Sequence, residues 1–434
     1  MIFLRIATRR IAIVVLATFV ATSSTAQQPE KTDKDLPATR TTFAVDFDVK
    51  IVPSEKSAEV VIRLGADAAP VEWLLLRADP MRHQGFEADG ELTQSSEGWT
   101  WHPPKRGGEL RFTFSIDHLR SEGSYDSRSA KRWAIFRGDD LVPQIRIRTD
   151  PIAHSKSRLR LQLPEGWSAA LPYRKNRDGS YQLNDPRSRF DRPAGWFVIG
   201  ELGAVRERFD NLRLTIAGPA GHGARRMDLL ALLRWTMPSI RELFGKLPDR
   251  LLVVTAADPM WRGGLSGTKS IYLHADRPLI EDDSTSPMLH ELVHTLMRAK
   301  AGRGGDWIVE GLAEYYSLEL LRRSGTLSQK RYVDALEKLK TKAAGADKLR
   351  VKSVDSSTRA RAVLVMREID EAIRSNTENL ASLDDVVQIL AGADRAVVTS
   401  QFREACEQVA GESIGSIFDR VVPPLPSKTT VKAQ

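Results

Sequence analysis

The chain has 434 residues, 41% of them hydrophobic, which is enough for two or three domains with cores of their own. Its formal net charge is +8, but the lysines and arginines are spread along the sequence and form no basic block interleaved with aromatic residues, so no nucleic-acid site is indicated. The single cysteine, Cys406, excludes an internal disulfide.

The first 26 residues have the pattern of a secretory signal peptide. Three arginines open the segment, an apolar run over residues 11–21 follows, and residues 24–26 (Ser-Thr-Ala) fit a small-residue cleavage site. The apolar run is short for a bilayer span, although an anchor retained without cleavage is the alternative. We therefore expect export to a periplasm or to the outside, without stable membrane insertion after the signal is removed.

Residues 27–205 are β-rich. Apolar and polar residues largely alternate in five segments, and turn signals with glycine separate them; the segments are 43–51, 59–64, 109–116, 144–148 and 158–163. A period of two is typical of strands that bury one face. The pattern predicts an N-terminal domain over 27–205 that is an antiparallel β-sandwich.

Strands and helices are mixed in the next region, 206–326. Strands are predicted at 212–217, 250–255 and 270–274, and a helix at 227–244 that Pro238 should kink or break. Just before the third strand stand the small residues Gly263 and Gly264, followed by Leu265. They either form a simple loop or allow a peptide backbone to lie close along an edge strand, which would make them substrate-binding residues.

The most informative motif is HELVH at residues 290–294, inside a predicted helix. Positions i and i+4 share one helix face, so His290 and His294 can bind the same metal ion, and Glu291 can reach a water molecule at that ion. Glu310 on the following predicted helix completes a His-His-Glu set that leaves one position open, as in catalytic rather than structural zinc sites. We expect one Zn²⁺ per chain, with Glu291 as the general base.

The residues around the motif support a folded helix rather than two solvated histidines. Ser286 suits the N-cap and Pro287 the first helical position. Glu314 stands four residues after Glu310, on the same helix face. It either accepts a hydrogen bond from His290 and fixes the tautomer of that ring, or it is a solvated glutamate.

The remainder of the chain is predicted to be a helical domain over residues 327–422, followed by a disordered tail over 423–434. Its apolar periodicity predicts helices at 332–342, 359–374, 383–390, 401–409 and 414–421.

The HELVH helix, the Trp-x-x-Glu-Gly segment at 307–311 and the Gly-Gly-Leu segment at 263–265 together resemble the gluzincin metallopeptidases, above all the glycyl aminopeptidase and aminopeptidase N groups. The resemblance is specific over residues 263–316 and weaker over 362–421. It implies an α+β multidomain fold with a β-domain, a thermolysin-like catalytic domain that carries the HExxH helix, and a C-terminal helical domain. It also implies hydrolysis of peptide or protein substrates, and it matches the motif residues to zinc ligands and general base as assigned above.

Three departures from that family matter. The spacer between His294 and Glu310 is shorter than usual, although the glycine-rich turn at 302–305 permits a tight reversal. Ser266 stands where the family has a glutamate that holds the free amino group of the substrate, so the sequence leaves aminopeptidase and endopeptidase activity open. The family's tyrosine before the next helix is missing, and Arg-Ala-Arg at 359–361 occupies that region.

Tyr315, Tyr316 and Arg361 are the candidates for the donor that would stabilise an oxyanion, and each has an ordinary alternative in packing or on a solvated face. An alternative function is a zinc-binding, catalytically weak peptide-binding protein derived from an aminopeptidase fold. Retention of Glu291 argues against it, because a binding protein needs no general base. The sequence does not indicate an oligomeric state.

Overall fold

The computed structural model describes residues 41–422 except 69, 186–187, 347, 352, 394–395 and 412–413. The predicted signal peptide and the predicted tail lie outside these described residues. Within them, no helix is both long and apolar enough to cross a membrane.

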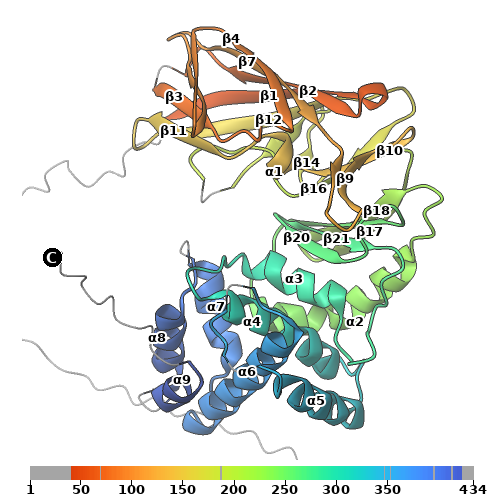
Figure 1. Cartoon of the computed structure of the whole chain (residues 1–434), viewed down its shortest axis with the longest axis vertical. Helices are drawn as coiled ribbons and strands as arrows, with labels where there is room; N and C mark the ends of the chain where they lie inside the picture. Colours follow the sequence, from red (N-terminus) through yellow and green to blue (C-terminus); the bar gives the residue numbers. More distant parts are fainter. Residues whose placement is uncertain are drawn as a thin grey trace, which may run out of the picture. The chain divides into compact units, whose positions relative to one another are not determined.

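The described N-terminal part consists of strands in three sheets, with a short 3₁₀ helix and a short α-helix (Figure 1). Its elements are β1 Thr42–Val52, η1 Pro53–Glu55, β2 Ser57–Leu64, β3 Val71–Leu76, β4 His83–Ala88, β5 Glu91–Ser95, β6 Gly98–His102, β7 Gly108–Ser115, β8 His118–Leu119, β9 Tyr125–Ser129, β10 Trp133–Arg137, α1 Gly138–Leu141, β11 Ile145–Thr149, β12 His154–Gln162, β13 Ser168–Ala170, β14 Arg174–Lys175, β15 Tyr181–Leu183 and β16 Trp196–Gly200. The strand orders are β14-β15-β12-β1-β2-β7-β4, β11-β3-β6-β5 and β13-β16-β10-β9-β8.

Strands lie at all five predicted segments, and their buried faces follow the alternation. In β1, Phe43, Val45 and Phe47 are fully buried while the residues between them are partly exposed. The predicted antiparallel pairing is wrong at one place. β1 is antiparallel to its neighbour β2 but parallel to its other neighbour, β12. Alternation shows which face of a strand is buried, but it carries no information about the direction of the neighbouring strand.

The rest of the chain combines one five-stranded sheet with helices (Figure 1). Its elements are β17 Leu202–Phe209, β18 Leu212–Pro219, α2 Arg226–Phe244, β19 Arg250–Ala256, β20 Gly264–Gly267, β21 Ser270–His274, α3 Pro287–Met297, α4 Asp306–Arg323, α5 Gln329–Ala343, α6 Ser356–Asn376, α7 Leu383–Gly392, α8 Thr399–Ala410 and α9 Gly415–Val421. The sheet order β17-β18-β19-β21-β20 places β20 at an edge. Helix α2 runs through Pro238 without a break.

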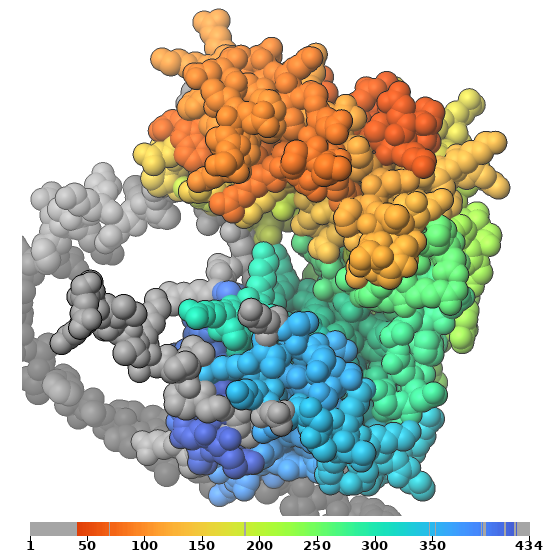
Figure 2. Space-filling view, in the orientation of Figure 1, coloured from red at the N-terminus to blue at the C-terminus, as the bar shows by residue number. Residues whose placement is uncertain are grey.

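This sheet is buried on both faces. On β19, Leu251 and Val253 belong to a core shared with helices α2–α9, whereas Leu252 and Val254 belong to a second core shared with β10 and β16. The contact between the N-terminal strands and this sheet is visible where yellow and orange residues meet green ones (Figure 2). Because both faces are covered, the sheet is a rigid support for α3, which packs on β20 and β21.

The protein is thus a mixed α/β chain with several sheets and helices. The domain boundaries expected after residues 205 and 326 stay predictions.

Candidate active site

Helix α3 presents two histidines on one face because its ends are well defined. The Ser286 hydroxyl accepts a hydrogen bond from the Leu289 N–H at 3.4 Å, and Pro287 occupies the first helical position. At the other end Arg298 adopts the left-handed conformation with φ 55°, and its N–H donates to the carbonyl of His294. The motif therefore lies within the helix, with His290 and His294 one turn apart.

His290, His294 and Glu310 converge on one point. His290 Nε2 lies 3.1 Å from His294 Nε2, and the Glu310 carboxylate lies 3.6 Å from the first ring nitrogen and 3.4 Å from the second. Tetrahedral ligands at about 2.0–2.1 Å from zinc are roughly 3.3 Å apart. Since the three donor atoms lie within 4.8 Å of one another, the set fits a single divalent cation.

A glycine turn makes the short spacer between His294 and Glu310 sufficient. The N–H of Gly302 donates to the carbonyl of Val397 at 2.7 Å, and a Cβ on Gly305 would stand only 2.0 Å from that same oxygen. Only glycine permits this close approach, and α4 begins at the next residue.

Glu314 is not a solvated surface glutamate. Its Oε2 lies 2.8 Å from Nδ1 of His290, and its side chain is 13% exposed. This contact leaves Nε2 of the ring to face the centre. Burial lowers the pKa of His290, but hydrogen bonds with Glu310 and Glu314 raise it to about 9. Burial raises the pKa of Glu310, yet its contacts with His290 and His294 bring it below its usual range.

Glu291 faces the edge strand. A Cβ on Gly264 would stand 2.9 Å from Cγ of Glu291, so the glycine lets the carboxylate lie against β20. The carbonyl of Gly263 accepts a hydrogen bond from the N–H of His274 in β21. The register then makes Leu265 opposite Tyr272, and Gly267 opposite Ser270, hydrogen-bonded pairs as well.

In an antiparallel pair of strands, opposite residues alternate between hydrogen-bonded and non-hydrogen-bonded pairs. Gly264 and Ser266 are in the non-hydrogen-bonded pairs, so their N–H and C=O groups point away from β21, towards the free edge of the sheet. The carbonyl of Leu265 is instead engaged, since it also accepts from the indole N–H of Trp196 at 3.0 Å.

These groups line one cavity of about 600 Å³, called the first hollow. It is lined by Trp261, Arg262, Gly263, Gly264, Leu265, Ser266, Arg277, Glu281, Thr285, Pro287, His290, Glu291, His294, Val309, Glu310, Glu314 and Arg359. Arg359 was not among the residues predicted for the site. Its Nη2 lies 3.3 Å from Oε2 of Glu310, so its guanidinium stands beside the three-residue centre.

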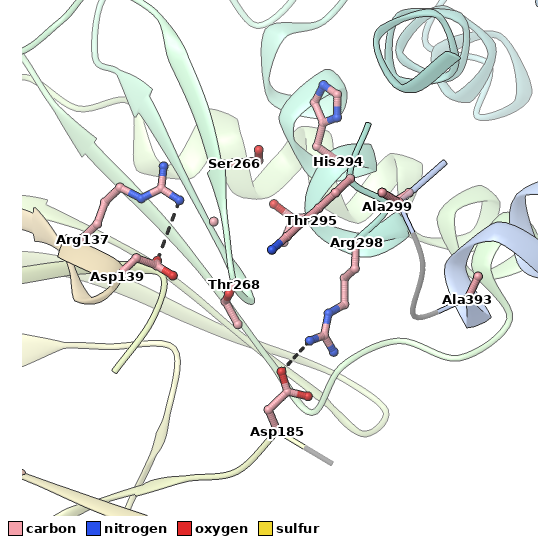
Figure 3. A pocket seen from close by; sticks show the side chains of 13 residues that line it. Arg137, Asp139, Asp185, Ser266, Thr268, His294, Thr295, Arg298, Ala299 and Ala393 are labelled. Atoms are coloured by element: carbon pink, nitrogen blue, oxygen red, sulfur yellow. Dashed lines mark hydrogen bonds and ion pairs between the residues drawn. The ribbon is translucent and has the colours of Figure 1, made fainter. Parts of the chain in front are cut away.

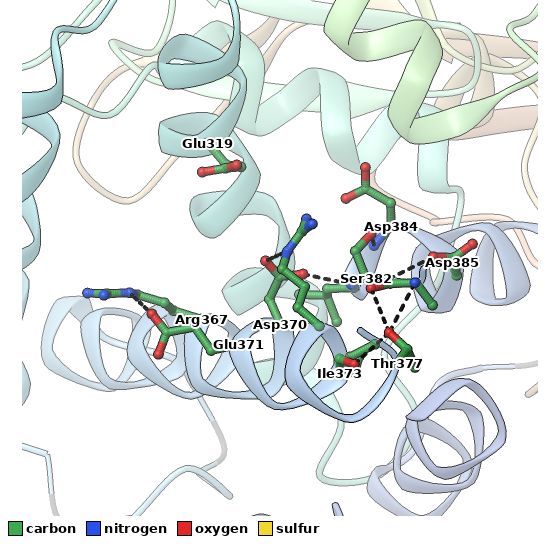
Figure 4. Close-up of polar contacts among 12 residues, drawn as sticks. Glu319, Arg367, Asp370, Glu371, Ile373, Thr377, Ser382, Asp384 and Asp385 are labelled. Atoms are coloured by element: carbon green, nitrogen blue, oxygen red, sulfur yellow. Dashed lines mark hydrogen bonds and ion pairs between the residues drawn. The ribbon is translucent and has the colours of Figure 1, made fainter. Parts of the chain in front are cut away.

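The three predicted oxyanion donors do not line the first hollow. The hydroxyl of Tyr315 donates to Asp370 at 3.2 Å and that of Tyr316 to Asp384 at 2.8 Å; both carboxylates are drawn in Figure 4. Arg361 donates to the carbonyl of Ala346. On a helix only some of the neighbouring positions face a given cavity, and sequence spacing alone did not identify which.

A second hollow of about 490 Å³ adjoins the first. It is lined by Arg137, Asp139, Asp185, Ser266, Gly267, Thr268, His294, Thr295, Arg298, Ala299, Lys300, Ala393 and Ala396 (Figure 3). The two hollows share Ser266 and His294. Sequence patterns gave no signal for it, because its wall combines residues more than a hundred positions apart.

Comparisons with known proteins bear on the fold and on the class of protein. The chain shares its fold with an aminopeptidase N family protein from Idiomarina loihiensis, whose crystal structure matches with a TM-score of 0.61 at 14% identity, over 88% of this chain and 74% of that one. A family model described as M61 glycyl aminopeptidase matches residues 288–381. No curated protein matches the chain. The resemblance to the gluzincin aminopeptidases is therefore confirmed, and the comparisons support a metallopeptidase that acts on peptides.

Proposed function

We propose that this chain is an exported zinc-dependent peptidase that hydrolyses peptide bonds with Glu291 as general base. The observation that carries the proposal is the convergence of two imidazoles and one carboxylate next to Glu291, at the free edge of a sheet. We further propose a thermolysin-like catalytic unit around α3 and α4 and a β-sandwich in the N-terminal part.

His290, His294 and Glu310 would hold one zinc ion. When bound, zinc supplies Lewis acidity, which lowers the pKa of water and polarises a carbonyl group. Glu291 takes the proton from the attacking water and delivers it to the nitrogen of the leaving amine. The carboxylate of Glu314 keeps His290 in the tautomer that turns Nε2 to the centre.

Arg359 takes the role of oxyanion donor that was predicted for Tyr315, Tyr316 or Arg361, none of which lines the first hollow. It is the one arginine of the first hollow that contacts a residue of the centre. Its guanidinium donates a hydrogen bond to the carbonyl oxygen of the substrate as negative charge builds there. Because the cation is fixed before the reaction, it stabilises the transition state more than the ground state.

The free edge of β20 positions the substrate. The backbone groups of Gly264 and Ser266 can pair with an extended peptide, as in strand addition at a sheet edge. Gly264 carries no side chain, which keeps the peptide close to Glu291.

The test compares the wild-type chain with Glu291→Gln for zinc content and for cleavage of a peptide library. We expect one zinc per chain in both and a loss of about 10²–10⁴-fold in kcat/KM for the variant. Glu337→Gln, on the exposed face of α5, is the matched control and should cleave as the wild type does.

If both proteins hold zinc and are equally inert, the catalytically weak peptide-binding protein becomes the better description. A chain that takes up no zinc after reconstitution contradicts both. Export is tested separately, by the mass of the mature protein, which should begin after Ala26.

A further inference from the structure

The second hollow continues the first one along the same strand. The first hollow runs from Trp261 past the three-residue centre to Ser266. The second hollow begins at Ser266 and follows Gly267 and Thr268; Ser266 and Thr268 are labelled in Figure 3. Ser266 offers a hydroxyl group and no charge at the junction. Space for a polypeptide therefore continues beyond the residues that would act on the scissile bond.

The pairing of β20 indicates which part of a substrate would enter the second hollow. β20 is antiparallel to β21, and antiparallel addition on the free edge is the more stable mode per residue. A peptide added in that sense runs from Gly267 towards Gly264. The residues that precede the scissile bond would then lie along the second hollow.

Among the described residues that line the second hollow, Arg137, Arg298 and Lys300 are cationic, and Asp139 and Asp185 are anionic. Its two carboxylates each have an arginine close by: Asp185 accepts from Arg298 at 2.8 Å, and Asp139 lies 3.8 Å from Arg137 (Figure 3). Lys300 is exposed and has no ion-pair partner among the residues that the structure describes. The local charge therefore repels a free α-ammonium group and attracts a carboxylate.

We propose that the second hollow is a substrate subsite for the polypeptide stretch before the scissile bond, with a preference for an acidic side chain about two to four residues before it. The enzyme then cuts inside polypeptides and requires no free amino terminus. The proposal rests on the peptidase function given above and names the substrate class of that site.

The experiment uses twelve-residue peptides with an acetylated amino end and a fluorophore at the carboxyl end. A single Glu or Lys is moved along an otherwise neutral sequence, and the cut position is read by mass spectrometry. We expect internal cuts, and kcat/KM about 3–10-fold higher for Glu than for Lys when the charge precedes the cut. Cleavage of free but not acetylated peptides would overturn the proposal, as would a charge effect only after the cut.

Lys300→Glu tests the origin of the preference. It should lower the Glu-to-Lys ratio of kcat/KM to about one or invert it, whereas Lys246→Glu, which lines neither hollow, should leave the ratio unchanged. An unchanged ratio in Lys300→Glu contradicts the proposal.

Binding of the same peptides to Glu291→Gln, followed by fluorescence anisotropy, separates the two claims. If the wild type cuts nothing, but the variant prefers the Glu peptide and loses that preference with Lys300→Glu, the peptidase assignment fails and the subsite stands. If the wild type cuts peptides and no preference appears in either measurement, only the subsite fails.

Discussion

The two halves of α4 hold carboxylates with different partners. In the first half, Glu310 and Glu314 contact the imidazoles of α3. In the second half, Glu319 is 2% exposed and receives hydrogen bonds from Arg322 and Arg323, the latter at 2.9 Å.

The difference in partners separates a functional cluster from a structural one. Burial would raise the pKa of Glu319, but the arginines hold it below its usual range, and no further cation is needed there. The carboxylates near the histidines have partners whose lone pairs also favour a cation, so that cluster can hold a metal ion, as proposed above. The following predictions change one partner at a time.

The largest effect is expected for Glu310→Gln. The variant should lose the stoichiometric zinc, and kcat/KM should fall at least about 10³-fold, because a neutral amide is a poor ligand for zinc. Zinc content is measured by elemental analysis, and kcat/KM is measured on the peptide library. After chelation, the wild type and the variant should unfold within about 1 kcal/mol of each other. Full zinc binding by the variant would remove Glu310 from the centre.

Glu319→Gln should give the opposite result. The variant removes the buried carboxylate that Arg322 and Arg323 share, although Arg323 keeps its contact with Asp384 and Arg322 is partly exposed. The free energy of unfolding should therefore fall by about 1–3 kcal/mol, measured by chemical denaturation. The folded fraction should still bind one zinc. Glu371→Gln is the control: Glu371 forms an exposed ion pair with Arg367, and its loss should change stability by less than about 1 kcal/mol. A zinc-free but stable Glu319→Gln would reverse the comparison.

Arg359→Met should reduce kcat/KM about 10²–10³-fold with zinc content unchanged, because it removes a donor to the developing oxyanion. Arg361→Met is the control. Arg361 lies two residues from Arg359 but outside the first hollow, so the kcat of this variant should match that of the wild type. Equal kcat/KM in Arg359→Met and wild type would show that another group stabilises the charge.

Asp191 is a buried carboxylate that forms no ion pair with a histidine or an arginine among the described residues, so it adds to the comparison a carboxylate without such a partner. Burial raises its pKa from 3.8 to about 6, although the Asp185 N–H donates to it. A raised pKa in the folded state means that the carboxylate costs stability as the pH rises from about 4 to above 6.

Asp191→Asn keeps the acceptor and removes the charge. It should therefore raise the free energy of unfolding by about 1–3 kcal/mol at pH 7.5 and leave it unchanged near pH 3.5. Denaturant titrations at the two pH values measure the difference, and a stabilisation that is equal at both would contradict the assigned cause.

Local sequence patterns predicted where strands and helices lie better than they predicted which strands pair and in which direction. The predicted strands and helices followed from periodicity and capping, as at Ser286 and Pro287, because these signals arise between residues close in sequence. Other strands, such as β10 and β16, were not predicted. The parallel pairing of β1 with β12 did not follow, since partner and direction depend on residues more than a hundred positions away.

The sequence by itself determined the fold class and the residue types of the centre, because HExxH places its two histidines one helical turn apart whatever surrounds the helix. Only the tertiary structure decided that Arg359, rather than Tyr315, Tyr316 or Arg361, lines the first hollow. It also decided that the second hollow exists, since its wall joins α1, the segment after β15 and the end of α3. The physical reason is that side-chain direction and cavity shape result from packing between distant segments, which no short-range pattern encodes.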